Sequence, residues 1–244
     1  MKDTEAIYTN GKWEFDEKVT DCFEDMLERS IPQYEVIRAS VTNLARDVID
    51  FSKKETVSIL DIGCSDGIML ERLVSKFSDF EKIKFYGIDV SDPMITKAKH
   101  RLLDDVISHK VTIDKCDLRE SYPDGMFDVI TSVLSVQFTP IEHRQKILHN
   151  IYKSLSAKNG CLLMVEKVLG NTSELNQLFV KNYYDMKLQN GYSQEQIDRK
   201  RLSLEGVLVP VTNDWNVDLL KQDGFRQIDV FWRWMNFVGY IALK

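Results

Sequence analysis

Along the chain, short apolar runs alternate with segments in which apolar residues recur at every third or fourth position. The runs are rich in β-branched residues, a pattern typical of buried strands, and the periodic segments indicate amphipathic helices. Strict alternation of the two predicts an α/β fold built on a parallel, doubly wound sheet with right-handed crossovers. The strands expected in this part of the chain are residues 57–60, 84–88, 110–113, 127–133 and 160–165.

Helical segments precede this alternation and interrupt it near its end. Residues 15–27 have apolar positions at helical spacing, with Asp16 in the N-cap position. Pro32 suits the first turn of a second helix, which reaches about Val48. Between residues 171 and 210 the alternation of strands and helices stops. This segment predicts a mostly helical insertion.

The last part of the chain returns to the core pattern. A helix at 215–222 is expected to stop at Gly224, and apolar strands at 227–232 and 236–243 follow. We therefore expect one domain with a seven-stranded, mostly parallel sheet. Residues 1–14, polar with one Trp, predict a mobile or ligand-capping arm. The expected parts are an N-terminal helical cap (1–50), a core half (57–168), the helical insertion acting as a lid (171–210) and a closing helix with two strands (211–244).

The stretch V-S-I-L-D-I-G-C-S-D-G, residues 57–67, joins the first strand of the sheet to a helix. Its turn through Gly63, Ser65 and Gly67 is expected to present backbone N–H groups and a positive helix end to a ligand. An ordinary strand-to-helix turn is the alternative. The dinucleotide pattern G-x-G-x-x-G is not met, because Ser65 stands two residues after Gly63. An acidic residue followed by G-x-S-x-G resembles motif I of the class I S-adenosylmethionine (SAM) methyltransferases.

Carboxylates follow three successive strands of the predicted sheet. Asp61 ends the first strand, Asp89 ends the second, and Asp117 closely follows the third. Ligands of such sheets bind at the carboxyl ends of the strands. One carboxylate can accept an ammonium, another a ribose diol and the third an adenine amino group. Each Asp could instead cap the next helix, but three in succession beside the Gly63 turn favour a nucleoside with an amino-acid tail.

The composition favours a small-molecule ligand. The 244 residues are 43% hydrophobic and 29% charged, as in ordinary globular proteins. A formal net charge of −6 argues against a broad basic surface for direct nucleic-acid binding. No apolar run approaches the roughly 20 residues that span a bilayer, and the N-terminus lacks a signal-peptide core, so we expect no membrane contact.

The cysteines stand singly, with no C-x-x-C pair and no histidine at metal-ligand spacing. We therefore expect neither a disulfide nor a bound metal, and reduced thiols in a cytoplasmic protein. The four cysteines are Cys22, Cys64, Cys116 and Cys161.

Two further segments attract attention without identifying a reaction. Tyr183, Tyr184 and Lys187 lie together in K-N-Y-Y-D-M-K, which equally suits a helix with one core face and one solvated face. The run Arg199-Lys200-Arg201 is, by its pattern, a solvated helix face.

Over nearly its whole length, the sequence resembles the carboxy-S-adenosylmethionine synthases, a bacterial branch of the class I SAM methyltransferase-like, Rossmann-like fold. Motif I is shared by many unrelated methyltransferases, whereas the motifs near residues 29–34 and 190–210 are more specific. The matching stretches are W-E-F-D-E-K-V (13–19), R-S-I-P-Q-Y (29–34), D-I-G-C-S (61–65), V-Q-F (136–138), N-G-Y-S (190–193), K-R-L-S-L-E-G-V-L-V-P (200–210) and the terminal N-F-x-G-Y-I-A-L-K.

The resemblance implies an enzyme that binds SAM and prephenate. Prephenate loses CO2, which the methyl carbon of SAM captures as a sulfonium ylide, and the product serves the carboxymethylation of a wobble uridine in tRNA. It also implies a homodimer, as is common in the family. Arg201 and Tyr184 are the expected catalytic residues, with the Arg201 guanidinium holding the new carboxylate as a bidentate cation. The expected SAM-binding residues are Tyr34, Gly63, Cys64, Ser65, Asp89, Asp117, Leu118 and Val133.

The chain departs from the family pattern at two positions where the family commonly has Asn, namely Val90 and Val133. Both changes remove a polar contact near the expected ligand. Four hypotheses therefore stand together. They are carboxy-SAM synthesis, methyl transfer to a small acidic or aromatic metabolite, intramolecular closure of the SAM aminocarboxypropyl arm with release of methylthioadenosine, and SAM binding without turnover. Retention of Arg201 favours the first.

Overall fold

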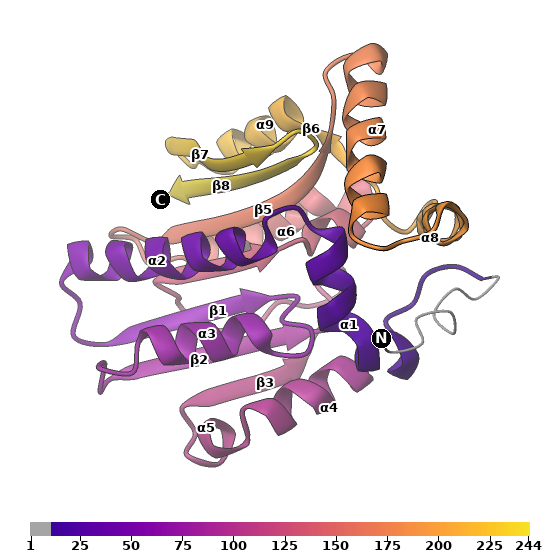
Figure 1. Ribbon diagram of the computed structural model, residues 1–244. Helices are drawn as coiled ribbons and strands as arrows, with labels where there is room; N and C mark the ends of the chain where they lie inside the picture. The colour runs from indigo at the N-terminus through magenta and orange to yellow at the C-terminus, as the bar shows by residue number, and fades with distance from the viewer. Residues whose placement is uncertain (1–10) are drawn as a thin grey trace.

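The computed structural model describes residues 11–244 as three layers, with one sheet between two layers of helices (Figure 1). The strand order is β3-β2-β1-β4-β5-β8-β7, and the short β6 pairs with the end of β5. β8 runs antiparallel to both of its neighbours, and the other pairings are parallel. The strands are β1 (Val57–Ile62), β2 (Ile83–Asp89), β3 (Val111–Lys115), β4 (Val129–Val133), β5 (Cys161–Leu169), β6 (Val211–Thr212), β7 (Gln227–Trp234) and β8 (Phe237–Leu243).

Helices cover both faces of the sheet, as its apolar strands require. α2, α3 and α4 pack on one face, where Ile37, Leu70 and Ala98 are fully buried. α6 and α9 pack on the other face through residues such as Ile147 and Leu220. The helices are α1 (Glu17–Ser30), α2 (Tyr34–Ser52), α3 (Ile68–Lys76), α4 (Asp92–Arg101), α5 (Leu103–Ile107), the 3-10 turn η2 (Val136–Phe138), α6 (Ile141–Ser154), α7 (Ser173–Gln189), α8 (Gln194–Leu204) and α9 (Asn213–Asp223).

The predicted fold class is confirmed. The mostly parallel sheet follows the expected alternation, and α9 stops at Gly224, whose φ of 108° is in the left-handed region. The insertion at 171–210 is helical, forming α7 and α8. Three short elements, α5, η2 and β6, were not predicted, because two to five residues are too few to display a period.

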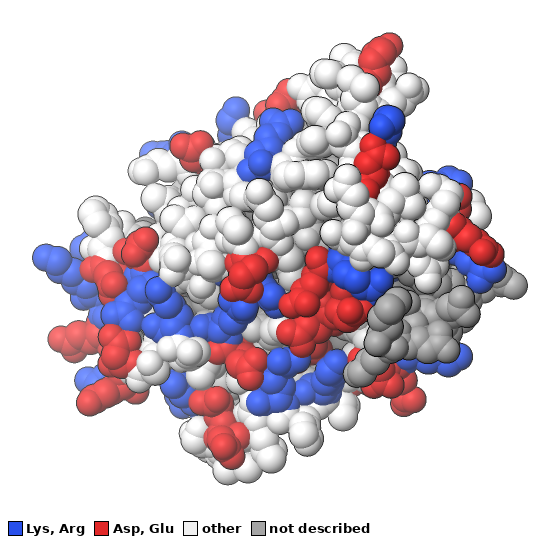
Figure 2. Space-filling model, viewed as in Figure 1, with Lys and Arg blue, Asp and Glu red and all other residues white. Residues whose placement is uncertain are grey.

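The carboxyl ends of the parallel strands lie at one edge of the sheet, and α1, α7 and α8 gather beside that edge (Figure 1). The strand order reverses there, because β2 lies on one side of β1 and β4 on the other. A ligand crevice is expected at such a switch point. On the face shown in Figure 2, acidic and basic side chains are interspersed over α2, α3 and α4, with few charges over α7 and β8.

The N-terminal arm expected at residues 1–14 is described only from residue 11 onward. Within it, Trp13 is buried, and its backbone N–H donates to the Ser203 carbonyl at 2.8 Å. α1 begins at Glu17, directly after the predicted N-cap Asp16, whose carboxylate accepts from the Val19 N–H at 2.9 Å. Along residues 11–244, none of the helices combines the length and apolar character needed to cross a bilayer.

Candidate active site

One cavity of ≈ 580 Å³ lies at the carboxyl ends of β1, β2 and β4, beneath α1, α7 and α8. Its size suits a nucleoside with an additional small substrate. The ten residues that the family resemblance assigns to SAM binding or catalysis all line this cavity, whereas Gly67 of the predicted turn does not. The ten residues are Tyr34, Gly63, Cys64, Ser65, Asp89, Asp117, Leu118, Val133, Tyr184 and Arg201.

The loop between β1 and α3 does not present its N–H groups as expected. Gly63 and Cys64 both donate to the Ile88 carbonyl, at 2.8 and 3.0 Å, and Gly67 donates to the Cys64 carbonyl. The Ser65 N–H donates to Asp89 Oδ2 at 2.9 Å. These four donors are therefore satisfied within the protein, so the loop contributes shape and not an anion-binding nest.

Gly63 is required by its surroundings. Its φ is +67°, and a Cβ at this position would lie 2.1 Å from Ser135 Oγ. Since Ser135 also lines the cavity, the β1 loop and the segment after β4 approach each other closely, with the Ser135 side chain in the space that a Cβ at position 63 would take. Any larger residue at position 63 would push apart two walls of the cavity.

Asp61 is a buried carboxylate that is only half satisfied. Its Oδ1 accepts a hydrogen bond from Thr131 Oγ1 at 2.6 Å, whereas Oδ2 has no partner in the protein. Burial raises the pKa of Asp61 to about 7, with a smaller contribution from Asp89, and the Thr131 hydrogen bond acts in the opposite direction. Because Asp61 lines the cavity, this oxygen without a partner is suited to accept a hydrogen bond from the ammonium of a ligand.

Asp89 and Asp117 have different environments. The two Asp89 oxygens accept from the Ser65 and Ser91 N–H groups at 2.9 Å, and burial raises the Asp89 pKa. Each oxygen retains a lone pair for a ligand hydroxyl. Asp117 is half-buried and paired with Arg119, whose guanidinium lowers the Asp117 pKa.

A buried guanidinium lies beside Tyr34 on the same cavity. Arg38 has its charged group 4.2 Å from the Tyr34 ring centroid, and its Nη2 pairs with Glu35 at 3.0 Å. Arg38 Nε and Nη1 are buried without partners. Burial raises the pKa of the Tyr34 hydroxyl, and Asp61 adds to that shift. Asp61, Tyr34 and Arg38 are therefore electrostatic neighbours.

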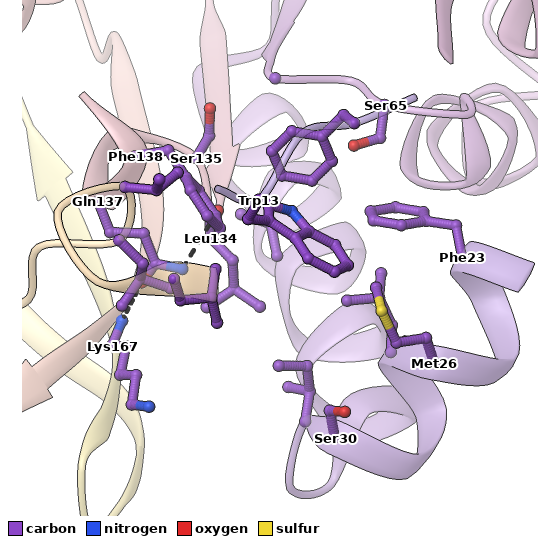
Figure 3. A pocket seen from close by; sticks show the side chains of 18 of the residues that line it. Trp13, Phe23, Met26, Ser30, Ser65, Leu134, Ser135, Gln137, Phe138 and Lys167 are labelled. Carbon is purple, nitrogen blue, oxygen red and sulfur yellow. Dashed lines mark hydrogen bonds between the residues drawn. The ribbon is translucent and has the colours of Figure 1, made fainter. Parts of the chain in front are cut away.

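Three lysines from different elements also line the cavity. They come from β5 (Lys167), α7 (Lys187) and α8 (Lys200), and burial lowers the pKa of each, to about 8 for Lys167 and Lys187. Figure 3 shows Lys167 across the cavity from Met26 and Ser30 of α1. The prediction that Lys200 lies on a solvated face is wrong, because its side chain is half-buried. Its ammonium lies 2.6 Å from the Trp13 ring centroid.

The motifs that carry the family resemblance contact one another although they lie far apart in the sequence. Ser30, in R-S-I-P-Q-Y, shares a hydrogen bond of 3.0 Å with the Tyr192 hydroxyl, in N-G-Y-S. Trp13, in W-E-F-D-E-K-V, is bonded to Ser203 and covers Lys200, both in the K-R-L-S block. Figure 3 places Trp13 between α1 and the loop that carries Phe138. The motifs therefore pack against one another beside the cavity.

The V-Q-F motif connects the loop after β4 to Lys167 of β5. The buried Gln137 side chain donates to the Leu134 carbonyl at 3.4 Å and accepts from the Lys167 N–H at 2.7 Å (Figure 3). Buried Glu166 accepts from the Val136 N–H at 3.1 Å, and its burial raises its pKa to about 8. These bonds hold Lys167 in place against the cavity.

Arg201 and Tyr184 lie close to each other on α8 and α7. Burial raises the pKa of Tyr184, and the positive charge of Arg201 opposes this shift. Arg201 is exposed at the cavity wall, and its Nη1 pairs with Glu205 at 3.0 Å. A substrate carboxylate could therefore replace Glu205 on Arg201 without desolvating a buried pair.

The sequence is similar to curated proteins over nearly its full length. It is 35% identical over 230 residues to a carboxy-S-adenosyl-L-methionine synthase of Methylococcus capsulatus, covering 94% of this chain and 93% of the relative. It is 36% identical over 233 residues to the synthase of the same name from Nautilia profundicola, covering 96% and 95%. The chain belongs to the carboxy-S-adenosyl-L-methionine synthase family. The resemblance noted in the sequence is confirmed, and with it the expectation of a SAM-dependent transferase.

Other similarities place the carboxy-S-adenosyl-L-methionine synthase family within a wider fold. A methyltransferase domain model matches residues 59–158. The structure is similar to human N-acetylserotonin methyltransferase in complex with SAM, with a TM-score of 0.57 and 15% identity, covering 93% of this chain and 55% of that one. It is also similar to PigF with SAH, with a TM-score of 0.59 and 14% identity, covering 94% and 60%. Both solved structures share the fold of this chain.

Several cavity residues were missed by the sequence reasoning. Arg38 lies on a helix whose polar positions have no distinguishing pattern, and Lys187 was singled out in K-N-Y-Y-D-M-K without a role. Lys167 did carry a signal, because it interrupts the long apolar run of β5 in the middle of a sheet. A lone charge in such a strand indicates either a partner or a ligand.

Proposed function

We propose that this protein converts SAM and prephenate into carboxy-SAM. One observation carries the proposal. A single cavity holds all the positions that the family resemblance assigns to ligand binding, and Arg201 and three lysines are among the residues that line it. Family membership, at 35% identity over 94% of the chain, supports the same reaction.

The residues present fit SAM. Asp61 Oδ2 would accept the SAM ammonium, and the unpartnered Nε and Nη1 of Arg38 would hold its carboxylate. Asp89 retains acceptor capacity for the ribose hydroxyls, and Asp117 with Leu118 would meet the adenine. A zwitterion would give each of these two buried groups, which have opposite charges, the partner that it lacks within the protein.

SAM supplies the methyl carbon that takes up CO2. Prephenate releases its ring carboxylate as CO2 and its ring hydroxyl as hydroxide, which accepts one proton from the methyl group to give water. The remaining electron pair of that C–H bond forms the new bond to CO2, and phenylpyruvate is the other product. Arg201, assisted by Tyr184, would hold the new carboxylate, because a guanidinium binds it in bidentate fashion.

The test is to incubate the protein with SAM, with and without prephenate, and to analyse the products by mass spectrometry. The expected product is heavier than SAM by the mass of one CO2 and forms only with prephenate. Release of methylthioadenosine would instead favour ring closure of SAM, and a methylated third compound would favour methyl transfer. SAM binding without any product would indicate a protein that binds SAM without turnover.

The remaining expectations extend the same proposal. Carboxy-SAM would serve the modification of a wobble uridine in cytoplasmic tRNA by another enzyme, so this chain would need no direct contact with the nucleic acid. The insertion 171–210 would act as a lid. A homodimer is expected, and Leu175 and Leu178, exposed on α7, give an apolar surface for it.

A further inference from the structure

Lys167, Lys187 and Lys200 all line the cavity, and none has an acidic partner among residues 11–244. None of the ion pairs formed by residues 11–244 includes them, although other lysines do pair, as Lys181 does with Asp185 at 2.6 Å. Lys187 is buried, and Lys167 and Lys200 are half-buried with the cavity beside them. The three ammonium groups are therefore desolvated charges that no described carboxylate neutralises.

Aromatic rings are the main contacts of these groups. The Lys167 ammonium lies 4.4 Å from the Tyr183 ring centroid, and the Lys187 ammonium lies 4.6 Å from that of Tyr192. The Lys200 ammonium lies over Trp13 and 3.3 Å from Met26 Sδ. Ring faces attract a cation more weakly than a carboxylate does when both are desolvated. The rings hold the side chains in place and leave their charge available.

The three charges also act on one another. Lys167 contributes to the lowered pKa of Lys187, and Lys187 to that of Lys200. The first cause in every case is burial. Like charges this close in a low-dielectric site are unfavourable until an anion joins them. The cavity volume of ≈ 580 Å³ is typical of a small-molecule site, which favours a small anion.

We infer that Lys167, Lys187 and Lys200 form the subsite that binds the carboxylates of a small dicarboxylate substrate. The inference rests on the proposed function and deepens it, since prephenate carries two carboxylates. Arg201 then remains for the carboxylate on the product. In this arrangement, lysines of β5, α7 and α8 bind the substrate, and the carboxylates at the strand ends bind SAM.

The test is titration calorimetry of prephenate into the SAM-saturated protein and into Lys167→Met, Lys187→Met and Lys200→Met. Methionine retains the length of the side chain and removes the charge. Each variant should bind prephenate roughly 10- to 100-fold more weakly, the effect of one charge-assisted hydrogen bond. Lys181→Met, on the outer face of α7, is the matched control and should bind like the wild type.

Two further readouts separate a binding role from a structural one. The melting temperature of each SAM-free variant should stay the same or rise, because an unpaired buried charge has been removed. Wild-type binding near pH 8, measured in buffers of different ionisation enthalpy, should take up protons, because the anion favours the charged ammonium groups.

The outcomes distinguish this inference from the proposed function. Variants that bind prephenate normally, or a wild type that takes up no protons, overturn the lysine subsite even if carboxy-SAM forms. Lysine-dependent binding without carboxy-SAM formation supports the subsite and overturns the function. A lower melting temperature together with unchanged affinity would assign the lysines to packing alone.

Discussion

The acidic and the basic ends of the cavity differ in how their buried charges are stabilised. At the acidic end, Asp89 accepts two backbone N–H groups and Asp117 pairs with Arg119, so most of the negative charge is satisfied within the fold. At the basic end, the ammonium groups of Lys167 and Lys187 face rings and each other. The acidic groups lie at the carboxyl ends of β1, β2 and β3, whereas the lysines come from β5, α7 and α8. An end that lacks internal partners depends more strongly on its ligand.

The largest expected effect concerns Arg201. Arg201→Ala should lower kcat/KM for prephenate by about two orders of magnitude, because a charge-assisted contact is worth up to about 3 kcal/mol. SAM affinity should hardly change, and Arg201→Lys should recover only part of the activity. Arg199→Ala is the control, since Arg199 pairs with Glu195 and does not line the cavity. If the product forms equally well in Arg201→Ala, the role assigned to this side chain is wrong.

The acidic end should respond in the reverse way. Asp89→Ala should weaken SAM binding by roughly 1–3 kcal/mol, the loss expected for charged hydrogen bonds, as measured by calorimetry. Prephenate binding to the SAM-saturated variant should stay close to that of the wild type. Asp92→Asn, on the exposed first turn of α4, serves as the control. Unchanged SAM affinity in Asp89→Ala would remove this carboxylate from the site.

Opposite pH dependences should distinguish the two ends. Asp61 must be ionised to accept the SAM ammonium, so SAM affinity should fall about tenfold per pH unit below pH 7. Prephenate affinity should fall instead as the pH rises through about 8, where Lys167 and Lys187 lose their protons. Asp61→Asn should abolish the first dependence and leave the second. Two parallel profiles would contradict the separation of the ends.

The stability of the ligand-free protein should also depend on pH, through the same titratable groups. The pKa of Asp61 is raised above its ordinary value of 3.8, so this group stabilises the ligand-free fold below pH 4, and that contribution is lost as the pH rises through about 7. The lysine pKa values are lowered from 10.5, so their contribution is present above that pH and is lost as the pH falls through about 8. Melting curves at several pH values measure both.

The smallest expected effect comes from the two valines that depart from the family pattern. Val133 lines the cavity beside Leu134, and Val90 is exposed next to Asp89. Val133→Asn and Val90→Asn should each strengthen SAM binding by about 0.5–1.5 kcal/mol if they restore a hydrogen bond to the ligand. Calorimetry that shows weaker binding instead would mean that this chain has repacked around an apolar contact.

The sequence predicted the acidic end more completely than the basic one, for a physical reason. Asp61 and Asp89 directly follow β-branched runs, and strand ends of a parallel sheet must meet at one edge. Lys187 and Lys200 lie on helices, where a polar residue usually faces solvent, and only tertiary contacts, of Lys187 with Tyr192 and of Lys200 with Trp13, turn them inward. Arg201 was found because a family resemblance, and not its local pattern, singled it out.

The indole of Trp13 gives the protein an optical property. Of the four tryptophans, all within the described part of the chain, Trp13 alone lines the cavity, and its ring is in contact with the Lys200 ammonium. A positive charge against an indole alters the energy of its excited state. An anion that draws Lys200 away should therefore shift the emission of Trp13, whereas a ligand confined to the strand ends should shift it little. Fluorescence of the unlabelled protein would then report, in real time, which half of the cavity fills first.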